Sequence, residues 1–273
     1  MSNEYNFKIP TITNYEVNYY FSDTETLCPA RIYPFHMHDS IEIYILLEGD
    51  VSFAVESSLY KLSAGDAIIT KPNEMHNCIL NSDSLHKHLC FWFDCGSGFL
   101  FGDFLSHDFG KNNLVSPDAE SKKTLSNLYE ELKGASDAGD THRQFYITLQ
   151  ILYILRKFVS GESSPQILPD SLTAILRDID ENFSEIKRIE DIVSKHFISR
   201  STLNRLFREY LHTTPKKYLE SKRLAYSRML LREGKSVLDA CMEAGFSDCS
   251  NYIRLFRKHF DITPKQYKDS KKF

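Results

Sequence analysis

Two adjacent segments decide the fold of this chain: Glu243-Ala-Gly-Phe-Ser-Asp248 and Asn251-Tyr-Ile-Arg-Leu-Phe-Arg-Lys258. The core of the second segment, Arg254-Leu-Phe-Arg257, occurs also as Arg205-Leu-Phe-Arg208, which lies 49 residues earlier. The same offset relates three further pairs: Ser201 and Ser250, Thr214-Pro-Lys216 and Thr263-Pro-Lys265, and Tyr218 and Tyr267. Two copies are too few for a solenoid, so the repeat predicts a duplicated structural motif.

Each copy has the layout of a helix-turn-helix motif. In the first copy, a helix over Ile189–His196 is followed by the turn Phe197-Ile198 and by Ser199, a residue type that caps helices. The corresponding parts of the second copy are Val237–Glu243, Ala244-Gly-Phe246 and a cap at Ser247 or Asp248. Gly245 suits the positive φ of a tight turn. Pro215 and Pro264 disfavour helix in the residue before them, so each second helix ends ahead of its proline.

Helical geometry separates a buried face from an exposed face in the second helix of each copy. In the first copy, the apolar face holds Leu203, Leu206, Phe207 and Tyr210, and the opposite face holds Ser201, Arg205 and Arg208 with Asn204 at its flank. In the second copy, the apolar face holds Tyr252, Leu255, Phe256 and His259. The opposite face holds Ser250, Arg254 and Arg257, with Ile253 at its flank. A helical bundle with solvated arginines explains each copy singly, but not why both repeat the same outward residues.

The outward side chains are types that read DNA bases: arginine pairs with guanine, asparagine with adenine, and an aliphatic group contacts the thymine methyl. We predict base reading by Ser201, Asn204, Arg205, Ser250, Ile253 and Arg254, and phosphate contacts by Arg200, Arg208, Arg257 and Lys258. One helix over Lys216–Glu233, about 27 Å long, would set the two recognition helices near the roughly 34–36 Å of one DNA turn.

Charge is distributed unevenly along the chain. The chain has 33 lysines and arginines and 37 aspartates and glutamates. Residues 170–273 hold 21 of the basic and 15 of the acidic residues, a net charge of +6. Residues 1–169 hold the other 12 basic and 22 acidic residues, a net charge of −10. A basic C-terminal part is typical of a domain that meets a polyanion, although an ordinary surface also carries such a charge.

The C-terminal segments resemble the DNA-binding domain of AraC/XylS-type transcription regulators over about residues 172–270. Two positions depart from the family's pattern: Cys241-Met242 stands in place of an Ile-Ala pair, and Phe197 fills a turn position often held by a small residue. The resemblance implies a regulator that activates or represses nearby promoters. Its implied partners are double-stranded promoter DNA, a small-molecule effector, a second copy of the chain in a homodimer, and RNA polymerase.

The N-terminal part predicts a β-sandwich or small barrel. Short β-branched and aromatic runs are separated by turn residues, and we expect strands at Ala30–Phe35, Ile41–Leu47, Val51–Val55, Ala67–Thr70 and His88–Phe93. Helical periodicity then begins after about residue 120, with Leu125, Leu128, Tyr129 and Leu132 in one helix and Phe145, Leu149, Leu152 and Leu155 in the next. These two helices either cap the barrel or form a dimerisation seam.

A group of polar residues marks the expected interior of the barrel. His36, His38 and Glu42 would share one face of a continuous strand, and His76 follows Gly65-Asp66 and Pro72. This pattern is similar to the two cupin motifs, HxHxxxE and GD…P…H, whose side chains hold Fe, Mn, Ni or Zn in metal-bearing cupins. Sensor barrels joined to this type of DNA-binding domain often use the cavity for an organic effector instead, and a turn at Asp39-Ser40 would break the strand.

We therefore predict an effector pocket formed by His36, His38, Glu42, Tyr44, His76 and Trp92. The first alternative is a divalent metal held by His36, His38, Glu42 and His76; purely structural histidines are the second. Tyr44, Phe91, Trp92 and Phe93 are expected to form an aromatic wall, which would suit a carbohydrate effector.

The predicted fold class is α+β: an N-terminal cupin-like β-barrel with two following helices, and a C-terminal all-α domain with two helix-turn-helix motifs. The expected domains are an effector-binding and dimerisation domain over 1–160 (barrel about 20–100, helices about 120–160), a polar linker over 161–170 and a DNA-binding domain over 171–273.

The sequence favours a regulator without a cofactor over an enzyme, because it contains no nucleophile–base arrangement, no phosphate-binding glycine loop and no paired acid–base carboxylates. The alternatives are a metal-dependent cupin enzyme with an appended helical domain, and a constitutive regulator whose barrel only dimerises. No run reaches the roughly 18 apolar residues of a membrane span, and the opening residues, MSNEYNFKIP, lack the basic region and apolar core expected of a secretory signal. The six cysteines form no CxxC pair, so we expect reduced thiols in the cytoplasm.

Overall fold

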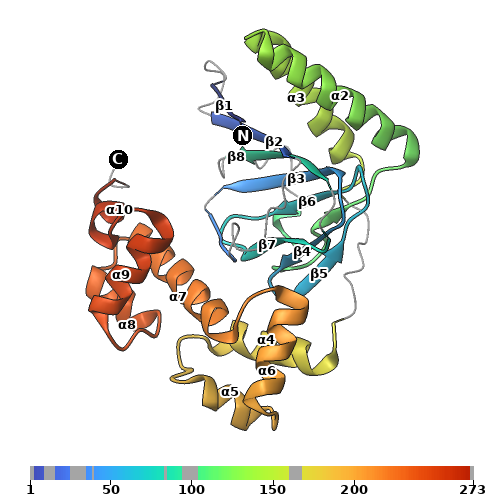
Figure 1. Ribbon diagram of the computed structural model, residues 1–273. Coiled ribbons are helices and arrows are strands. Elements are labelled where there is room, and N and C mark those ends of the chain that lie inside the picture. The colour runs from blue at the N-terminus through green and yellow to red at the C-terminus, as the bar shows by residue number, and fades with distance from the viewer. Residues whose placement is uncertain are drawn as a thin grey trace. The chain divides into compact units, whose positions relative to one another are not determined.

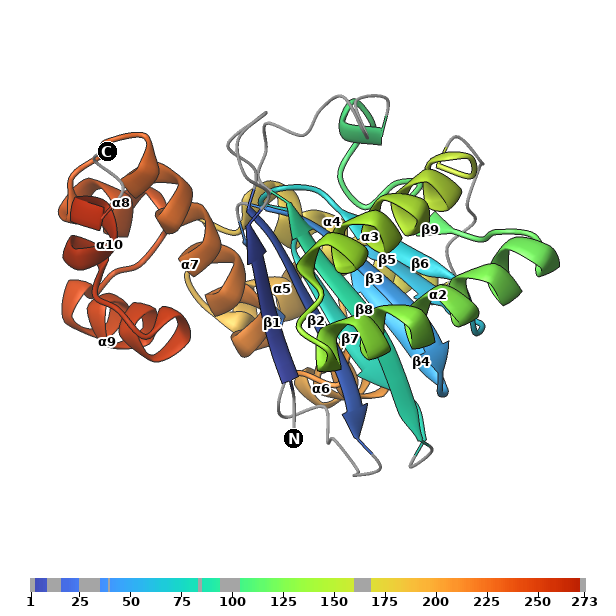
Figure 2. The ribbon, with the colours of Figure 1, turned by 90° about the horizontal axis from the view of Figure 1, so that it is seen from above.

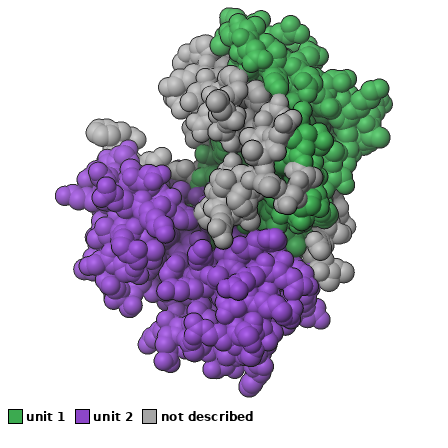
Figure 3. All heavy atoms as spheres, in the orientation of Figure 1, with its two compact units in different colours: residues 1–33, 38–167 green, residues 34–37, 168–273 purple. Residues whose placement is uncertain are grey.

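The computed structural model describes residues 3–8, 16–24, 35–38, 40–82, 85–93, 104–159 and 168–270. The chain divides into two compact units (Figure 3): a first unit of residues 1–33 and 38–167, and a second unit of residues 34–37 and 168–273. Most of the predicted linker, 161–170, lies outside the described residues, so the proposed domain limits stay a prediction.

The strands of the first unit form two sheets (Figure 1). The six-stranded sheet has the order β1-β2-β8-β3-β6-β9, and the three-stranded sheet has the order β5-β4-β7. All strand pairs are antiparallel. The strands are β1 (Asn3–Lys8), β2 (Glu16–Thr24), β3 (Ile41–Glu48), β4 (Val51–Val55), β5 (Ser58–Lys61), β6 (Ala67–Thr70), β7 (His76–Leu80), β8 (His86–Phe93) and β9 (Leu114–Val115).

Side-chain alternation along β3 assigns the two faces of the larger sheet. Ile41, Ile43 and Ile45 belong to a buried cluster with apolar residues of α2 (Ala119–Asp137) and α3 (Thr141–Arg156). Figure 2 shows the two helices lying across this face. Tyr44 and Leu46 point the other way and pack with residues of β4 from the smaller sheet. The interior between the two sheets is therefore lined by Glu42 and its alternate neighbours.

The expected aromatic wall is wrong for two of its four residues. Phe91 and Phe93 belong to the cluster beneath α2 and α3, whereas Tyr44 and Trp92 lie in or against the interior cluster. The reason is the two-residue period of a strand, which sends Trp92 to the face opposite its two neighbours.

The predicted strands at Val51–Val55 and Ala67–Thr70 are confirmed with the same bounds, and those beginning at Ile41 and His88 are longer by one and two residues. Sequence analysis missed β1, β2, β5, β7 and β9. The strand expected at Ala30–Phe35 lies outside the described residues except at Phe35, which is in a bend.

The second unit is helical. Its helices are α4 (Asp170–Asn182), α5 (Ile189–Lys195), α6 (Arg200–Leu211), α7 (Pro215–Arg232), α8 (Val237–Glu243), α9 (Cys249–Phe260) and α10 (Pro264–Ser270). Helices α5 and α6 form the first helix-turn-helix, α8 and α9 form the second, and α7 connects them (Figure 1). None of the helices in the described part of the chain is long and apolar enough to cross a bilayer.

Each recognition helix begins at a capping side chain. Ser199 accepts a hydrogen bond from the Thr202 amide at the start of α6, and Asp248 accepts bonds from the Ser250 and Asn251 amides at the start of α9. Such caps satisfy amides that have no partner within the helix. The cap expected at Ser247 or Asp248 is therefore Asp248.

The two turns differ by one residue. Phe197 and Gly245 hold the left-handed position of each turn, with φ of 51° and 86°, and they are 48 rather than 49 residues apart. The next amides, of Ile198 and Phe246, donate to carbonyls five residues earlier in both copies. The second copy thus has one extra residue before its recognition helix.

Candidate functional site

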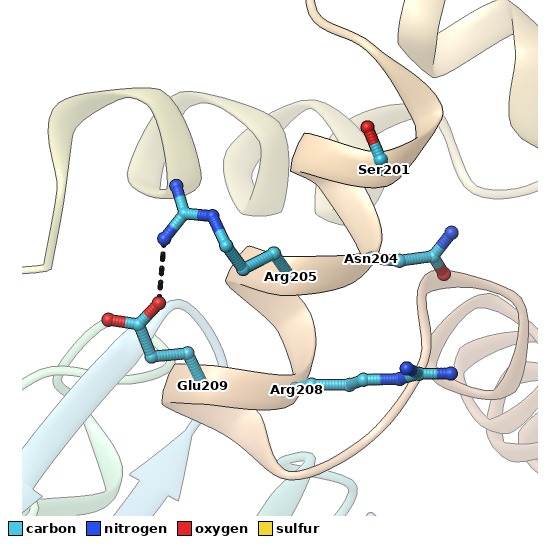
Figure 4. Close-up of a pocket in the computed structure, with 5 residues that line it drawn as sticks. All are labelled: Ser201, Asn204, Arg205, Arg208 and Glu209. Carbon is cyan, nitrogen blue, oxygen red and sulfur yellow. Dashed lines mark hydrogen bonds and ion pairs between the residues drawn. The ribbon is translucent and has the colours of Figure 1, made fainter.

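Helix α6 exposes the polar face that its periodicity predicted. Ser201, Arg205 and Arg208 are exposed and Asn204 is half-buried, whereas Leu203, Leu206 and Phe207 are buried. These four polar and charged side chains, with Glu209, line an open recess of about 630 Å³ formed by one face of the helix. In Figure 4, Arg205 points toward Glu209, while Asn204 and Arg208 extend from the other side of α6.

Helix α9 repeats this arrangement in the second copy. Ser250, Arg254 and Arg257 are exposed, and Ile253 keeps 40% of its surface accessible. Tyr252 and Phe256 anchor the opposite face in the core. The flanking positions therefore differ: α6 offers the amide of Asn204 where α9 offers the apolar side chain of Ile253.

The predicted base-reading arginines have polar partners on their own helices. Arg205 Nη1 donates to Glu209 Oε2 at 2.8 Å, and Arg254 Nη2 donates to Asn251 Oδ1 at 2.7 Å. Arg200 is paired with Glu190 at 2.6 Å. Exposed ion pairs contribute about 0–1 kcal/mol, so a phosphate or base edge can replace these partners at little cost.

The polar cluster predicted for the barrel is assembled in the interior. Three of its four members, His38, Glu42 and His76, come together in the first unit, whereas His36 lies in the segment 34–37, which belongs to the second unit. The segment before Ile41 is not a continuous strand, as the expectation for His36, His38 and Glu42 required: Ser40 forms a bend, and its carbonyl accepts a hydrogen bond from His38 Nδ1 at 2.9 Å. This bend turns the His38 ring back toward β3, so the break does not disperse the cluster.

Glu42 is the centre of this group. Its Oε2 lies 2.8 Å from His38 Nε2, 3.6 Å from His76 Nε2, and accepts a hydrogen bond from Trp92 Nε1 at 2.7 Å. Trp92 is the cross-strand partner of Glu42 on β8, which places both side chains on the same face. The only tryptophan of the chain therefore contacts the only buried carboxylate of this cluster.

Charge and burial oppose each other at these groups. Burial raises the pKa of the Glu42 carboxyl, but the charges and hydrogen bonds of His76 and His38 outweigh burial and hold the pKa well below its usual range. Burial lowers the pKa of His76, and the nearby Glu42 carboxylate more than offsets it, so the pKa of His76 is raised. The cluster therefore favours an anionic Glu42 carboxylate facing a protonated His76 imidazole.

A second polar group in the interior was missed by sequence analysis. The Tyr44 hydroxyl lies 2.6 Å from His86 Nε2, and the Tyr44 ring stacks on His88 at a centroid distance of 4.9 Å. The signal was present, because His86, His88, Cys90 and Trp92 alternate along β8 and so share the face of Tyr44. Starting the strand at His88 left His86 out.

Two family models match the chain. One, described as a cupin domain, matches residues 24–92, and one, described as a helix-turn-helix domain, matches residues 192–270. They occur in the order expected from the sequence, and the first spans Glu42, His76 and Trp92.

Curated relatives align along most of the chain. The HTH-type transcriptional activator RhaS is 26% identical over 241 residues in Citrobacter koseri and 24% identical over 236 residues in Escherichia coli, and each alignment covers 84% of both chains. Among solved structures, ToxT from Vibrio cholerae is 14% identical and covers 93% of this chain and 98% of its own, with a TM-score of 0.37. A transcriptional regulator with an AraC-type DNA-binding domain from Chromobacterium violaceum is 33% identical over 37% of this chain and 92% of its own, with a TM-score of 0.35.

Proposed function

The chain belongs to the AraC family of transcription regulators, and we propose that α6 and α9 read its promoter while the interior of the first unit binds its effector. The observation that carries the DNA-binding assignment is the repetition of one exposed face: serine and two arginines stand at matching positions of α6 and α9. Solvation explains an exposed arginine, but it sets no requirement that two helices repeat the same pattern.

The roles within this face follow from position. Residues in the first two turns of a recognition helix reach base edges, and those nearer its end or flank meet phosphates. We assign base reading to Ser201, Asn204, Arg205, Ser250, Ile253 and Arg254, and phosphate contact to Arg200, Arg208, Arg257 and Lys258. Asn204 and Ile253 would give the two half-sites different preferences, for adenine and for a thymine methyl respectively.

Helix α7 supports binding to two successive grooves. Its 18 residues correspond to about 27 Å, and the recognition helices add to this span on either side. One DNA turn measures about 34–36 Å. A single chain would then contact both half-sites on one face of the duplex.

The DNA contacts are tested by replacing one arginine in each copy. Arg205→Ala and Arg254→Ala are each expected to lose about 1–3 kcal/mol of affinity for a cognate promoter, because each removes one base contact. Binding curves by fluorescence anisotropy over a range of salt would also show the steep salt dependence of phosphate contacts. Arg177→Ala, an exposed arginine on α4, is the matched control. Unchanged affinity in both variants would refute the assignment.

For the effector, we propose a site formed by His36, His38, Glu42, Tyr44, His76 and Trp92. Its polar groups suit a small molecule rich in hydroxyl groups, and the Tyr44 and Trp92 rings offer apolar surfaces, so a carbohydrate is the first class to test. Trp92 provides the readout, because the sole tryptophan donates its indole N–H to Glu42.

An effector that binds this site is expected to change Trp92 fluorescence saturably and to shift promoter affinity over the same concentration range. Glu42→Gln should lose the saturable change, because it removes the negative charge at the centre of the site, and His142→Gln on the exposed surface of α3 should keep it. A compound that alters promoter affinity without altering Trp92 emission would place the effector elsewhere.

A bound divalent metal is the second candidate for this site, and one observation favours it. His38 and His76 both direct Nδ1 to a carbonyl oxygen, of Ser40 and Glu74, and leave Nε2 facing Glu42. Metal-bound histidines commonly have this outer hydrogen bond, and three imidazoles with a carboxylate suit Zn, Fe or Mn. Such an ion would supply a Lewis-acidic point for an effector's oxygen atoms. Elemental analysis of the purified chain and of His76→Ala separates the two: a stoichiometric ion lost in the variant establishes the metal.

The regulator assignment replaces the enzyme alternative, because the curated relatives that align along 84% of the chain are transcriptional activators and carry the helix-turn-helix part as well. As a regulator it would act in the cytoplasm as a homodimer, with residues 1–160 sensing and dimerising and 171–273 binding DNA. RNA polymerase is the expected further partner at the promoter.

A further inference from the structure

Two cysteines meet inside the second helix-turn-helix. Cys241 lies near the end of α8, and Cys249 is the first residue of the recognition helix α9. Their Sγ atoms are 2.8 Å apart. Non-bonded carbon atoms pack best at about 3.5–4.0 Å, and sulfur is the larger atom, whereas a disulfide bond measures about 2.05 Å. The fold therefore brings the two thiols closer than simple packing requires.

The two thiols differ in access. Cys241 is fully buried, and burial, followed by the adjacent Cys249, raises the pKa of the Cys241 thiol to about 12. Cys249 is only half-buried, and it stands beside the Asp248 cap at the surface. A small oxidant in solvent therefore reaches Cys249 first, and Cys241 is held against it as the second thiol.

A metal ion fits this pair less well. Two thiolates on one tetrahedral zinc lie about 3.8 Å apart, given a Zn–S bond of about 2.3 Å. Within the described residues, the group of three or more side chains able to hold a metal is the one around Glu42, and it includes neither cysteine. Distance and ligand number thus both favour a sulfur–sulfur bond.

We propose that Cys241 and Cys249 form a reversible disulfide that links thiol oxidation to the second DNA-reading helix. Hydrogen peroxide transfers one oxygen atom to the Cys249 thiol, which becomes a sulfenic acid, and the O–O bond breaks with release of one water. The Cys241 sulfur then attacks the sulfenic sulfur, gives up its proton and expels hydroxide, and these leave as a second water. Two thiols have supplied two electrons, and a dithiol reductant reverses the change by exchange.

The bond would act where the recognition helix begins. Closing the ring from residue 241 to residue 249 joins the end of α8, the Gly245 turn and the first turn of α9, next to Ser250. In the oxidised state the start of α9 is drawn toward α8, which restricts this turn and displaces the base-reading residues that follow. We expect oxidation to raise the thermal midpoint of the second unit by an amount on the order of 10 °C.

The bond is tested by mass spectrometry on the full chain after mild treatment with hydrogen peroxide. Cleavage after Lys235 and Arg254 yields one peptide, Ser236–Arg254, that contains both cysteines and no other. The expected product is this peptide two hydrogen atoms lighter, resistant to alkylation until a dithiol is added. Sulfinic or sulfonic acid at Cys249 with an alkylated Cys241, or a disulfide between two chains, would overturn the proposal.

Variants separate the bond from general oxidation damage. Cys249→Ser should abolish both the mass change and the rise in thermal midpoint, and Cys78→Ser, a half-buried cysteine of β7 in the first unit, should preserve both. Equal thermal midpoints for oxidised and reduced wild-type chain would overturn the structural effect.

The effect on DNA rests on the proposed function and is measured separately. Promoter affinity of the wild-type chain should fall at least about threefold on oxidation, part of the energy of one base contact, and Cys249→Ser should not respond. Equal affinities with a confirmed disulfide would overturn the coupling alone. Absence of promoter binding in either state would instead overturn the proposed function, because the mass change does not depend on DNA.

Discussion

Gly245 stands at the most confined position of the second helix-turn-helix. Its φ is +86°, and a Cβ there would lie 2.3 Å from the Ser184 carbonyl oxygen and 2.7 Å from the Ser184 Cα. In the first copy, Phe197 holds the equivalent position at φ 51° with 96% of its side chain exposed. A left-handed residue with a side chain is thus accommodated in the first turn because that side chain faces solvent.

Gly245→Ala is expected to destabilise the second unit by more than backbone strain alone. A left-handed L-residue costs about 1–2 kcal/mol, and the Ser184 backbone must also move, which we expect to bring the loss to about 3 kcal/mol or more. Gly234→Ala is the matched control, since Gly234 has φ +92° and nothing within 4 Å of the added methyl. Urea unfolding of both variants measures the difference. Equal losses of unfolding free energy in the two variants would mean that the Ser184 backbone moves away from the added methyl group at no measurable cost.

His88 gives the first unit a pH dependence of known sign. Burial, followed by the neighbouring His86, lowers the pKa of His88 to about 3. In the unfolded chain a histidine binds a proton near pH 6.5, so between these values the unfolded state holds more protons and stability rises with pH. From pH 6.5 to 5 the group should remove about 2 kcal/mol of unfolding free energy.

Replacing His88 isolates this contribution. Urea unfolding followed at several pH values should show a shallower loss toward pH 5 in His88→Gln than in the wild-type chain. His142→Gln, on the exposed face of α3, controls for the removal of a histidine. Parallel pH profiles for the wild-type chain and His88→Gln would contradict the effect of burial on His88.

At the scale of elements, the helices were predictable because their boundaries are encoded locally. The bounds of α8 follow from the Ser236 cap and the Gly245 turn. The buried and exposed faces of α6 and α9 follow from the 3.6-residue period of their apolar residues, because only one orientation of each helix buries all of these residues. Strands β5 and β7 were missed because their short runs, Ser58–Lys61 and His76–Leu80, begin with polar residues and resemble turns, whereas the equally short β4 and β6 are mostly apolar. They exist because β4 pairs with both of them, which is information from distant sequence.

The candidate interior site was predictable in composition but not in geometry. The spacing of His36, His38 and Glu42 suggested one strand face, whereas a bend at Ser40 and a hydrogen bond to its carbonyl orient His38. Trp92 was placed in the site through an aromatic wall that does not form, and it contacts Glu42 by cross-strand pairing. Register between β3 and β8 decides this contact, and no local pattern in either strand specifies register.

At the scale of the whole molecule, helix α3 leaves three large apolar side chains largely exposed, and within its unit the Lys157 ammonium lies over one of them, the Tyr153 ring, at 4.6 Å from its centroid. Tyr146, Leu149 and Tyr153 are 63%, 42% and 66% exposed, while Ile147, Ile151 and Leu155 on the other side are buried beneath it. The exposed three are spaced by three and four residues, as in the seam of a coiled coil. A second copy of α3, running antiparallel, would cover this face with matching residues, since a two-fold interface pairs one patch with itself.

Tyr146→Glu combined with Tyr153→Glu should therefore convert a dimer into a monomer at micromolar concentration, because each substitution places a charge in the seam and faces a like charge across the two-fold axis. Sedimentation velocity measures the mass, and circular dichroism checks that the helices persist. Asn127→Glu, which adds a charge to the exposed surface of α2, should leave the dimer intact.

Promoter binding should weaken in the double variant, since two chains joined by α3 bring four helix-turn-helix motifs to one operator and a monomer brings two. A dimer that survives both substitutions would assign the interface to another surface, and a wild-type chain that is monomeric under these conditions would remove dimerisation from the proposed function.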